Sequence, residues 1–91
     1  MEIKLRINNQ EKTFVNDFVS ARALRQNIEL RKTIKFEDLS VSDLDKLMQS
    51  VCDIFNKQFT IDDIYDGLAS NKLMPEIARI FKELSETMGE S

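Results

Sequence analysis

The chain has 91 residues, of which 42% are hydrophobic and 32% are charged, and its formal net charge at pH 7 is −3. This composition, with two glycines and one proline, predicts a single folded domain over residues 1–91 and excludes a long disordered tract. The chain has no histidine, so the commonest general base and the commonest metal ligand are both missing. Cys52 is the only cysteine, which excludes an intrachain disulfide and predicts a buried, unreactive thiol. We therefore expect no catalytic residues, no metal and no cofactor.

Neither a membrane nor a nucleic acid is an expected partner. No apolar run approaches the length of a bilayer span, and residues 1–6 alternate charged and apolar side chains where a signal peptide would be continuously apolar. A cytoplasmic location is therefore expected. Residues 1–35 carry eight Lys/Arg against four Asp/Glu, whereas residues 36–91 carry five against twelve. The two parts can attract one another within the fold, and the acidic net charge disfavours binding to a phosphate backbone.

The N-terminal residues predict a β-hairpin. Residues 3–7 alternate apolar and charged side chains, which is the period-2 pattern of a half-buried strand. Residues 8–11 (NNQE) form the turn, because asparagine tolerates the left-handed backbone of tight hairpins, and residues 12–15 form the return strand. A two-stranded hairpin is marginal in water, so its apolar face is expected to lie on helices.

The first helix is predicted between Phe18 and Ile34, with Ser20 or Asn16 as its N-cap. Its stripe is Ala21, Leu24, Ile28 and Arg31. Leu30 and Ile34 lie outside this stripe and predict a second apolar edge. That edge is covered either by the hairpin or by a partner protein.

The second helix is predicted to begin at Ser42, with Asp43 and Asp45 in its first turn. A continuous apolar stripe follows over three turns: Leu44, Leu47, Met48, Val51, Ile54 and Phe55. This stripe is the main expected contribution to the hydrophobic core.

A short third helix is predicted within Phe59–Leu68, with Thr60 as its cap and Gly67 as its stop. Its large side chains are expected to anchor it in the groove between the flanking helices: Phe59, Ile61, Ile64 and Leu68, with Tyr65 at the margin. Its aspartates resemble part of a calcium loop, but Ile64 and Leu73 stand where that loop requires oxygen ligands. The aspartates are therefore interpreted as carboxylates at a helix N-terminus.

The last helix is predicted to start at residues 69–71, with Pro75 in or near its first turn, and to end at Gly89-Glu90-Ser91. Its stripe is Leu73, Ile77, Ile80, Phe81, Leu84 and Met88. The predicted fold is therefore α+β and mainly helical, with an N-terminal β-hairpin followed by a small bundle of three longer helices and one short helix.

The short helix, the bend at residues 67–69 and the longer helix after it could imitate a helix-turn-helix that binds DNA. The second helix of that pair carries three glutamates, Glu76, Glu83 and Glu86, against three basic residues, Lys72, Arg79 and Lys82. Such a surface is poorly suited to a groove lined with phosphates, so this interpretation is disfavoured.

Three segments carry a resemblance to a known family. Phe18–Arg25 (FVSARALR) is similar to the start of that family's first helix after an N-terminal hairpin. Phe55–Leu68 (FNKQFTIDDIYDGL) is the most specific of the three, and Leu73–Ile77 (LMPEI) is similar to the helix start that follows. With the order of the elements, these segments resemble the tail assembly chaperones of long-tailed, siphovirus-type bacteriophages of Gram-positive bacteria.

The resemblance implies a non-enzymatic protein that binds the tape measure protein, keeps it soluble and promotes tail tube assembly. It implies a location in the cytoplasm of the bacterial host and absence from the mature virion. The implied partners are the tape measure protein, the tail tube protein, a frameshift-extended form of the same protein and further copies in a homo-oligomer. A small non-enzymatic protein-interaction adaptor stays open as the alternative.

A chaperone of an extended helical client needs apolar edges that exchange self-contacts for client contacts. We predict that these edges also drive self-association, and that they contain the protein-binding residues Leu30, Ile34, Phe36, Phe81, Leu84 and Met88. The structural signature of the resemblance comprises Phe59, Thr60, Asp63, Tyr65, Gly67 and Leu68.

Overall fold

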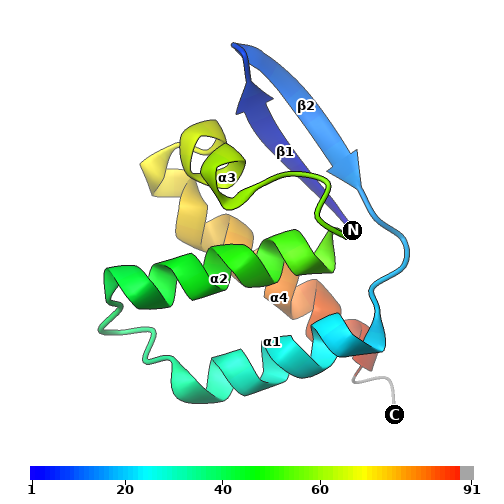
Figure 1. Cartoon of the computed structure of the whole chain (residues 1–91), viewed down its shortest axis with the longest axis vertical. Coiled ribbons are helices and arrows are strands. Elements are labelled where there is room, and N and C mark those ends of the chain that lie inside the picture. Colours follow the sequence, from blue (N-terminus) through cyan, green and yellow to red (C-terminus); the bar gives the residue numbers. More distant parts are fainter. Residues whose placement is uncertain (89–91) are drawn as a thin grey trace.

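A computed structural model describes residues 1–88, which form one β-hairpin and four helices. The elements are β1 (Glu2–Ile7), β2 (Gln10–Val15), α1 (Ala21–Thr33), α2 (Val41–Ile54), α3 (Ile61–Gly67) and α4 (Ser70–Met88). The predicted α+β, mainly helical fold is therefore confirmed. The hairpin lies beside α3 at one end of the molecule, α1 lies at the other end, and α2 lies between them (Figure 1). The predicted helix end at Gly89-Glu90-Ser91 lies outside the described residues.

The hairpin is tighter than predicted. β1 and β2 pair antiparallel with Ile7 opposite Gln10, so only Asn8 and Asn9 form the turn. Both asparagines have positive φ, at 54° and 64°, which is the backbone of a two-residue turn that matches the twist of the strands. Gln10 and Glu11, which were predicted in the turn, therefore belong to β2.

The apolar face of β1 lies on the helices, as predicted. Ile3 and Leu5 are almost completely buried, with exposed fractions of 1% and 0%. Phe14 of β2 contacts Phe59 edge to face, with 4.9 Å between ring centroids, and Phe59 contacts Phe55 at 5.5 Å. These rings join the hairpin to the end of α2 and the start of α3.

α1 forms where it was predicted, but a different face is buried. Ser20 caps the helix by accepting a hydrogen bond from the Ala23 N–H, at 3.1 Å. Ala23 and Asn27 are buried and Ala21 is exposed, whereas Leu24 is half-buried against the core, so the predicted stripe is only partly correct. The amide of Asn27 donates to the Ser50 hydroxyl of α2 at 3.1 Å, which makes a polar side chain the centre of the buried face.

The N-cap of α2 is Ser40, two residues earlier than predicted, because Ser40 and Asp43 form a reciprocal capping box. Ser42 lies inside the helix, so its assignment as the cap is wrong. The predicted stripe is confirmed, since its last five side chains are buried and Leu44 is half-buried against the core: Leu47, Met48, Val51, Ile54 and Phe55.

α3 is capped as predicted but ends for a different reason. Thr60 and Asp63 exchange the two bonds of a capping box, at 3.0 and 3.1 Å. Gly67 does not adopt a positive φ, so it is not a left-handed helix stop. A Cβ at Gly67 would lie 3.1 Å from both the Arg6 carbonyl oxygen and the Leu5 Cβ. Position 67 therefore favours glycine because α3 packs closely against β1 there. The prediction that α3 lies in a groove between the flanking helices missed this contact with the hairpin.

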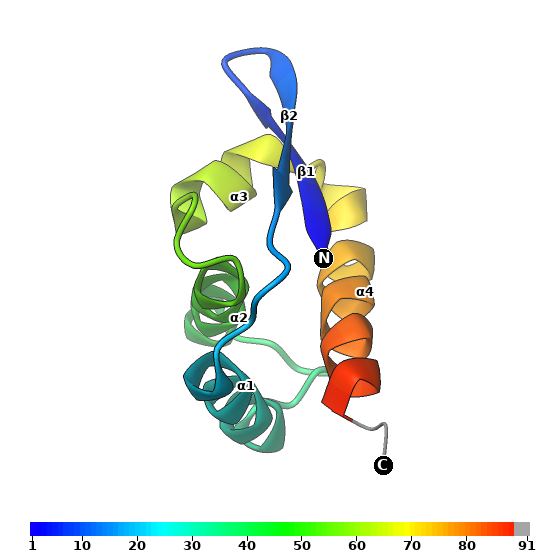
Figure 2. The ribbon, with the colours of Figure 1, turned by 90° about the vertical axis from the view of Figure 1, so that its right-hand side faces the viewer.

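α4 runs from beneath the hairpin to the level of α1, as Figure 2 shows. Arg79 donates to the Glu2 carbonyl oxygen at 2.8 Å, and Arg31 of α1 donates to the Ser85 hydroxyl at 2.7 Å. α4 therefore ties the two ends of the fold together. Pro75 lies in the second turn of α4 rather than in the first. Its ring nitrogen has no hydrogen, so one hydrogen bond to the preceding turn is missing there.

Asn16 joins the end of the hairpin to the end of α2. Its side-chain amide donates to the Phe18 carbonyl oxygen at 2.6 Å and to the Ile54 carbonyl oxygen at 2.7 Å. Its Oδ1 accepts hydrogen bonds from the Phe18 N–H and the Asn56 side chain, both at 3.2 Å. Its backbone pairs with Met1. The predicted role of Asn16 as a helix cap is wrong, because it is a buried junction between segments distant in sequence.

Replacing Asn16 with alanine is expected to lower the free energy of unfolding by about 2–3 kcal/mol, because buried carbonyl groups lose their donor. Urea denaturation followed by circular dichroism measures this change. The matched control is Gln49→Ala, which removes an exposed amide bonded to Asp53 and should change stability by less than about 0.5 kcal/mol. Equal stabilities of the two variants would contradict the role of Asn16.

Candidate protein-binding surface

The six residues predicted to bind protein do not form one exposed edge. Ile34, Phe81 and Leu84 are 7%, 5% and 3% exposed and belong to the hydrophobic core. Leu30 is half-buried against this core. Phe36, in the connection between α1 and α2, is exposed.

The side chain of Met88 lies outside the described residues. Leu30 and Ile34, which were predicted to form a second apolar edge of α1, therefore face the core. The burial of Ile34 explains why an apolar residue stands at the end of this helix. The protein-binding role of the six residues stays a prediction, and among those described only Phe36 has an exposed side chain, at 44%.

The signature residues of α3 make contacts within the fold. Phe59 is buried, and Tyr65 and Leu68 are half-buried against the core. The Tyr65 hydroxyl donates to Asp45 Oδ1 of α2 at 2.5 Å. Burial, this bond and the nearby aspartates raise the pKa of Tyr65 to about 12, so the phenol keeps its proton and its bond at neutral pH.

Large exposed apolar side chains indicate where a partner protein could bind more directly than the predicted residues do. Among the side chains described, those of residues 1–86, they are Val15, Phe18, Phe36 and Val41. Phe18 is the most exposed aromatic among them, at 71%. Phe18 was not predicted as a binding residue. The signal that could have identified it is its position before the helical stripe, which left it no expected place in the core.

Phe18 borders a cleft of about 460 Å³. The cleft lies between the β2–α1 connection and the second half of α4, and its lining residues are Met1, Asn16, Asp17, Phe18, Val19, Leu24, Glu83 and Leu84. In Figure 2 this connection runs in front of the helices from the end of β2 to α1, with α2 on its left and α4 on its right. The cleft has an apolar floor and acidic side chains, Asp17 and Glu83, among its lining.

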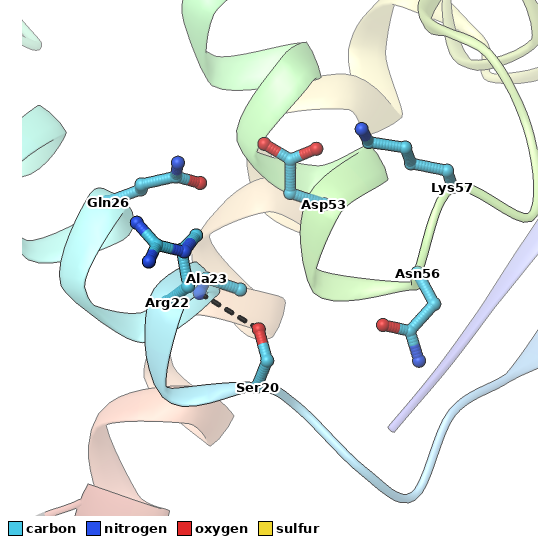
Figure 3. Close-up of a pocket in the computed structure, with 7 residues that line it drawn as sticks. All are labelled: Ser20, Arg22, Ala23, Gln26, Asp53, Asn56 and Lys57. Atoms are coloured by element: carbon cyan, nitrogen blue, oxygen red, sulfur yellow. Dashed lines mark hydrogen bonds between the residues drawn. The ribbon is translucent and has the colours of Figure 1, made fainter.

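A second groove, of about 320 Å³, separates the start of α1 from the end of α2 (Figure 3). Its lining residues are Ser20, Arg22, Ala23, Gln26, Asp53, Asn56 and Lys57. Asn56 and Lys57 both have a φ of 57°, and the Lys57 N–H donates to the Cys52 carbonyl oxygen at 2.7 Å, which closes the end of α2. Charges of both signs meet in this groove, so it is a polar surface with no apolar anchor.

A third groove, of about 890 Å³, lies where the hairpin meets the α3–α4 junction. Lys4, Arg6 and Lys72 line it together with Glu11 and Glu76. The Glu76 carboxylate is held by Arg79, with 2.8 Å between Oε1 and Nε. This groove is therefore of mixed charge, and it also has apolar residues in its lining, Leu68, Ala69 and Pro75.

Cys52 is buried as predicted, with an exposed fraction of 2%. Burial and the neighbouring Asp53 and Asp63 carboxylates raise the pKa of its thiol from 9.0 to about 11. At neutral pH the thiol is therefore protonated and shielded, which makes it a poor nucleophile.

Within residues 1–88 no three or more acidic or cysteine side chains come together in a group that could hold a metal ion. None of the helices in this part of the chain is both long and apolar enough to span a bilayer.

Comparison with known proteins identifies the family. A model of the phage tail chaperone protein family matches residues 1–91, which is the whole chain. No curated protein and no solved structure gave a match. Family membership implies a non-enzymatic role in assembling a phage tail. The chain therefore belongs to the phage tail chaperone proteins.

Proposed function

We propose that this protein binds the tape measure protein of its phage, keeps it soluble and promotes assembly of the tail tube around it. The observation that carries the proposal is the family match over residues 1–91. The exposed aromatic side chains and the apolar cleft beside Phe18 support it, because a chaperone needs accessible apolar surface for its client.

The proposal extends to where and with what the protein acts. Residues 1–91 act as one domain in the cytoplasm of a bacterial host, and the protein is absent from the mature virion. A siphovirus-type phage of a Gram-positive bacterium is the proposed source. The tail tube protein, a frameshift-extended form of the chain and further copies of it are proposed as additional partners.

Co-expression tests the proposal. The tape measure protein of the same phage is produced in bacteria alone, with the wild-type chain, and with a Val51→Asp variant whose core is disrupted. We expect the soluble fraction of tape measure protein to rise severalfold with the wild-type chain and to stay at its starting level with the variant. An unchanged soluble fraction with the wild-type chain would reject the chaperone function and favour an adaptor of another kind.

A further inference from the structure

Phe18 is held in place by its backbone while its ring is exposed. The Phe18 N–H donates to Asn16 Oδ1 at 3.2 Å, and its carbonyl oxygen accepts from the Asn16 amide at 2.6 Å and from Asn56 at 3.4 Å. Because Asn16 is itself buried and bonded to the Ile54 carbonyl, these bonds tie the backbone of Phe18 to the end of α2. Because these bonds already order the backbone, binding at the exposed ring, which is 71% accessible, would cost mainly the freedom of its two side-chain torsions.

The cleft beside Phe18 offers the second half of an apolar contact. Met1, Val19 and Leu24 are half-buried in its lining, and Leu84 forms part of the core beneath it. Its volume of about 460 Å³ lies within the range of ordinary ligand pockets and exceeds the volume of one large side chain. An apolar side chain of a partner can therefore enter the cleft and contact the Phe18 ring.

The charges of the cleft select its occupant. The ionisable side chains that line it are Asp17 and Glu83, and the N-terminal ammonium of Met1, the cation in this lining, already donates to the Asn16 carbonyl oxygen at 3.2 Å. Glu83 contacts Arg79 at 2.9 Å, whereas Asp17 has no ion pair within residues 1–88. Asp17 is exposed and lies next to Phe18 in the chain, so a lysine or arginine beside an inserted apolar side chain would meet an opposite charge.

From this geometry we infer that the Phe18 cleft is the client-docking site, and that it takes a client segment in which a bulky apolar side chain is flanked by lysine or arginine. The identity of the client rests on the proposed function. Aromatic side chains that pack with an apolar pocket are typical of residues that dominate the energy of an interface. The groove of Figure 3 has only Ala23 as an apolar lining residue, and the groove beside the hairpin has Leu68 and Pro75 but no aromatic side chain.

The test is capture of the tape measure protein of the same phage by the affinity-tagged full-length chain after co-expression. Phe18→Ser should reduce the captured amount at least about tenfold, as for an interface hot spot. Val41→Ser is the matched control, because Val41 is 78% exposed and lies outside the cleft, and it should stay within about twofold of wild type. Thermal melts must show that both variants fold as wild type does.

The contribution of the Asp17 charge at the edge of the cleft is tested separately with Asp17→Lys. This variant should reduce capture severalfold at about 0.05 M salt and by a smaller factor at about 0.5 M salt, because exposed charges are screened. No capture by the wild-type chain would reject the proposed function itself. Equal capture by wild type and Phe18→Ser would leave that function standing and overturn the docking site. A Phe18→Ser variant that changes only the oligomeric state would also overturn it, in favour of an interface between two copies.

Discussion

Replacing Val51 with aspartate is expected to unfold the protein at 25 °C. Val51 is 1% exposed and lies within the apolar stripe of α2, where a carboxylate would have neither water nor a cation. Burying an unpaired charge costs several kcal/mol, and the stability of a domain of this length is roughly 5–14 kcal/mol. The substitution also removes a branched apolar side chain from the core, which adds about 1–3 kcal/mol to the loss.

The matched control is Val41→Asp, the same change at the first residue of α2. Val41 is 78% exposed, and a carboxylate at a helix N-terminus interacts favourably with the helix dipole. This variant should be as stable as wild type or slightly more stable. Far-ultraviolet circular dichroism during heating distinguishes the two. If Val51→Asp melted with the wild-type midpoint, the assignment of this face of α2 to the core would be wrong.

Replacing Gly67 with valine is expected to lower the free energy of unfolding by about 2–3 kcal/mol. A Cβ at this position would already stand 3.1 Å from the Arg6 carbonyl oxygen and 3.2 Å from the Arg6 nitrogen, and both are backbone atoms that cannot rotate away. The two methyl groups of valine would need still more room, so α3 would have to move away from β1.

Gly67→Ala separates close packing from a simple preference for glycine. Alanine adds only the Cβ, and it favours a helix over glycine by about 1 kcal/mol, which offsets part of the crowding. We therefore expect Gly67→Ala to lie within about 1 kcal/mol of wild type by urea denaturation. A valine variant as stable as the alanine variant would show that α3 can withdraw from β1 at no cost.

Patterns that depend on neighbours in the chain predicted much of the fold. The stripe of α2 contains only apolar residues at its predicted core positions, so its spacing identified both the helix and its buried face. The bonds between Thr60 and Asp63 span three residues, and the start of α3 was therefore visible in the sequence. The same local signal stands at Ser40 and Asp43, and the prediction of Ser42 overlooked it.

The buried face of α1 could not be derived from apolar spacing alone. Asn27 is 0% exposed and bonds to Ser50, which is 23 residues away in the chain. Because the stripe was drawn through apolar residues, it left out the polar Asn27 and included Ala21, which is exposed. The partner that makes asparagine acceptable there comes from α2 and exists only after the helices pack.

The exposure of Phe18 also depends on distant residues. Asn16 reaches the Ile54 carbonyl across 38 residues and the Asn56 side chain across 40, and these bonds set the path of the backbone before α1. A local pattern shows only an aromatic residue ahead of a helix. The sequence therefore indicated a protein-binding role for the chain but did not identify Phe18 as a candidate residue.

The most direct test of the proposed function is whether the chain and the tape measure protein form one particle. The two proteins are co-expressed, purified through a tag on the chain, and passed through size-exclusion chromatography with light scattering. We predict a single peak that contains both proteins and has a mass well above the 10.6 kDa of the chain. Elution of the chain separately from the tape measure protein, with both at their unmixed masses, would contradict the proposed function.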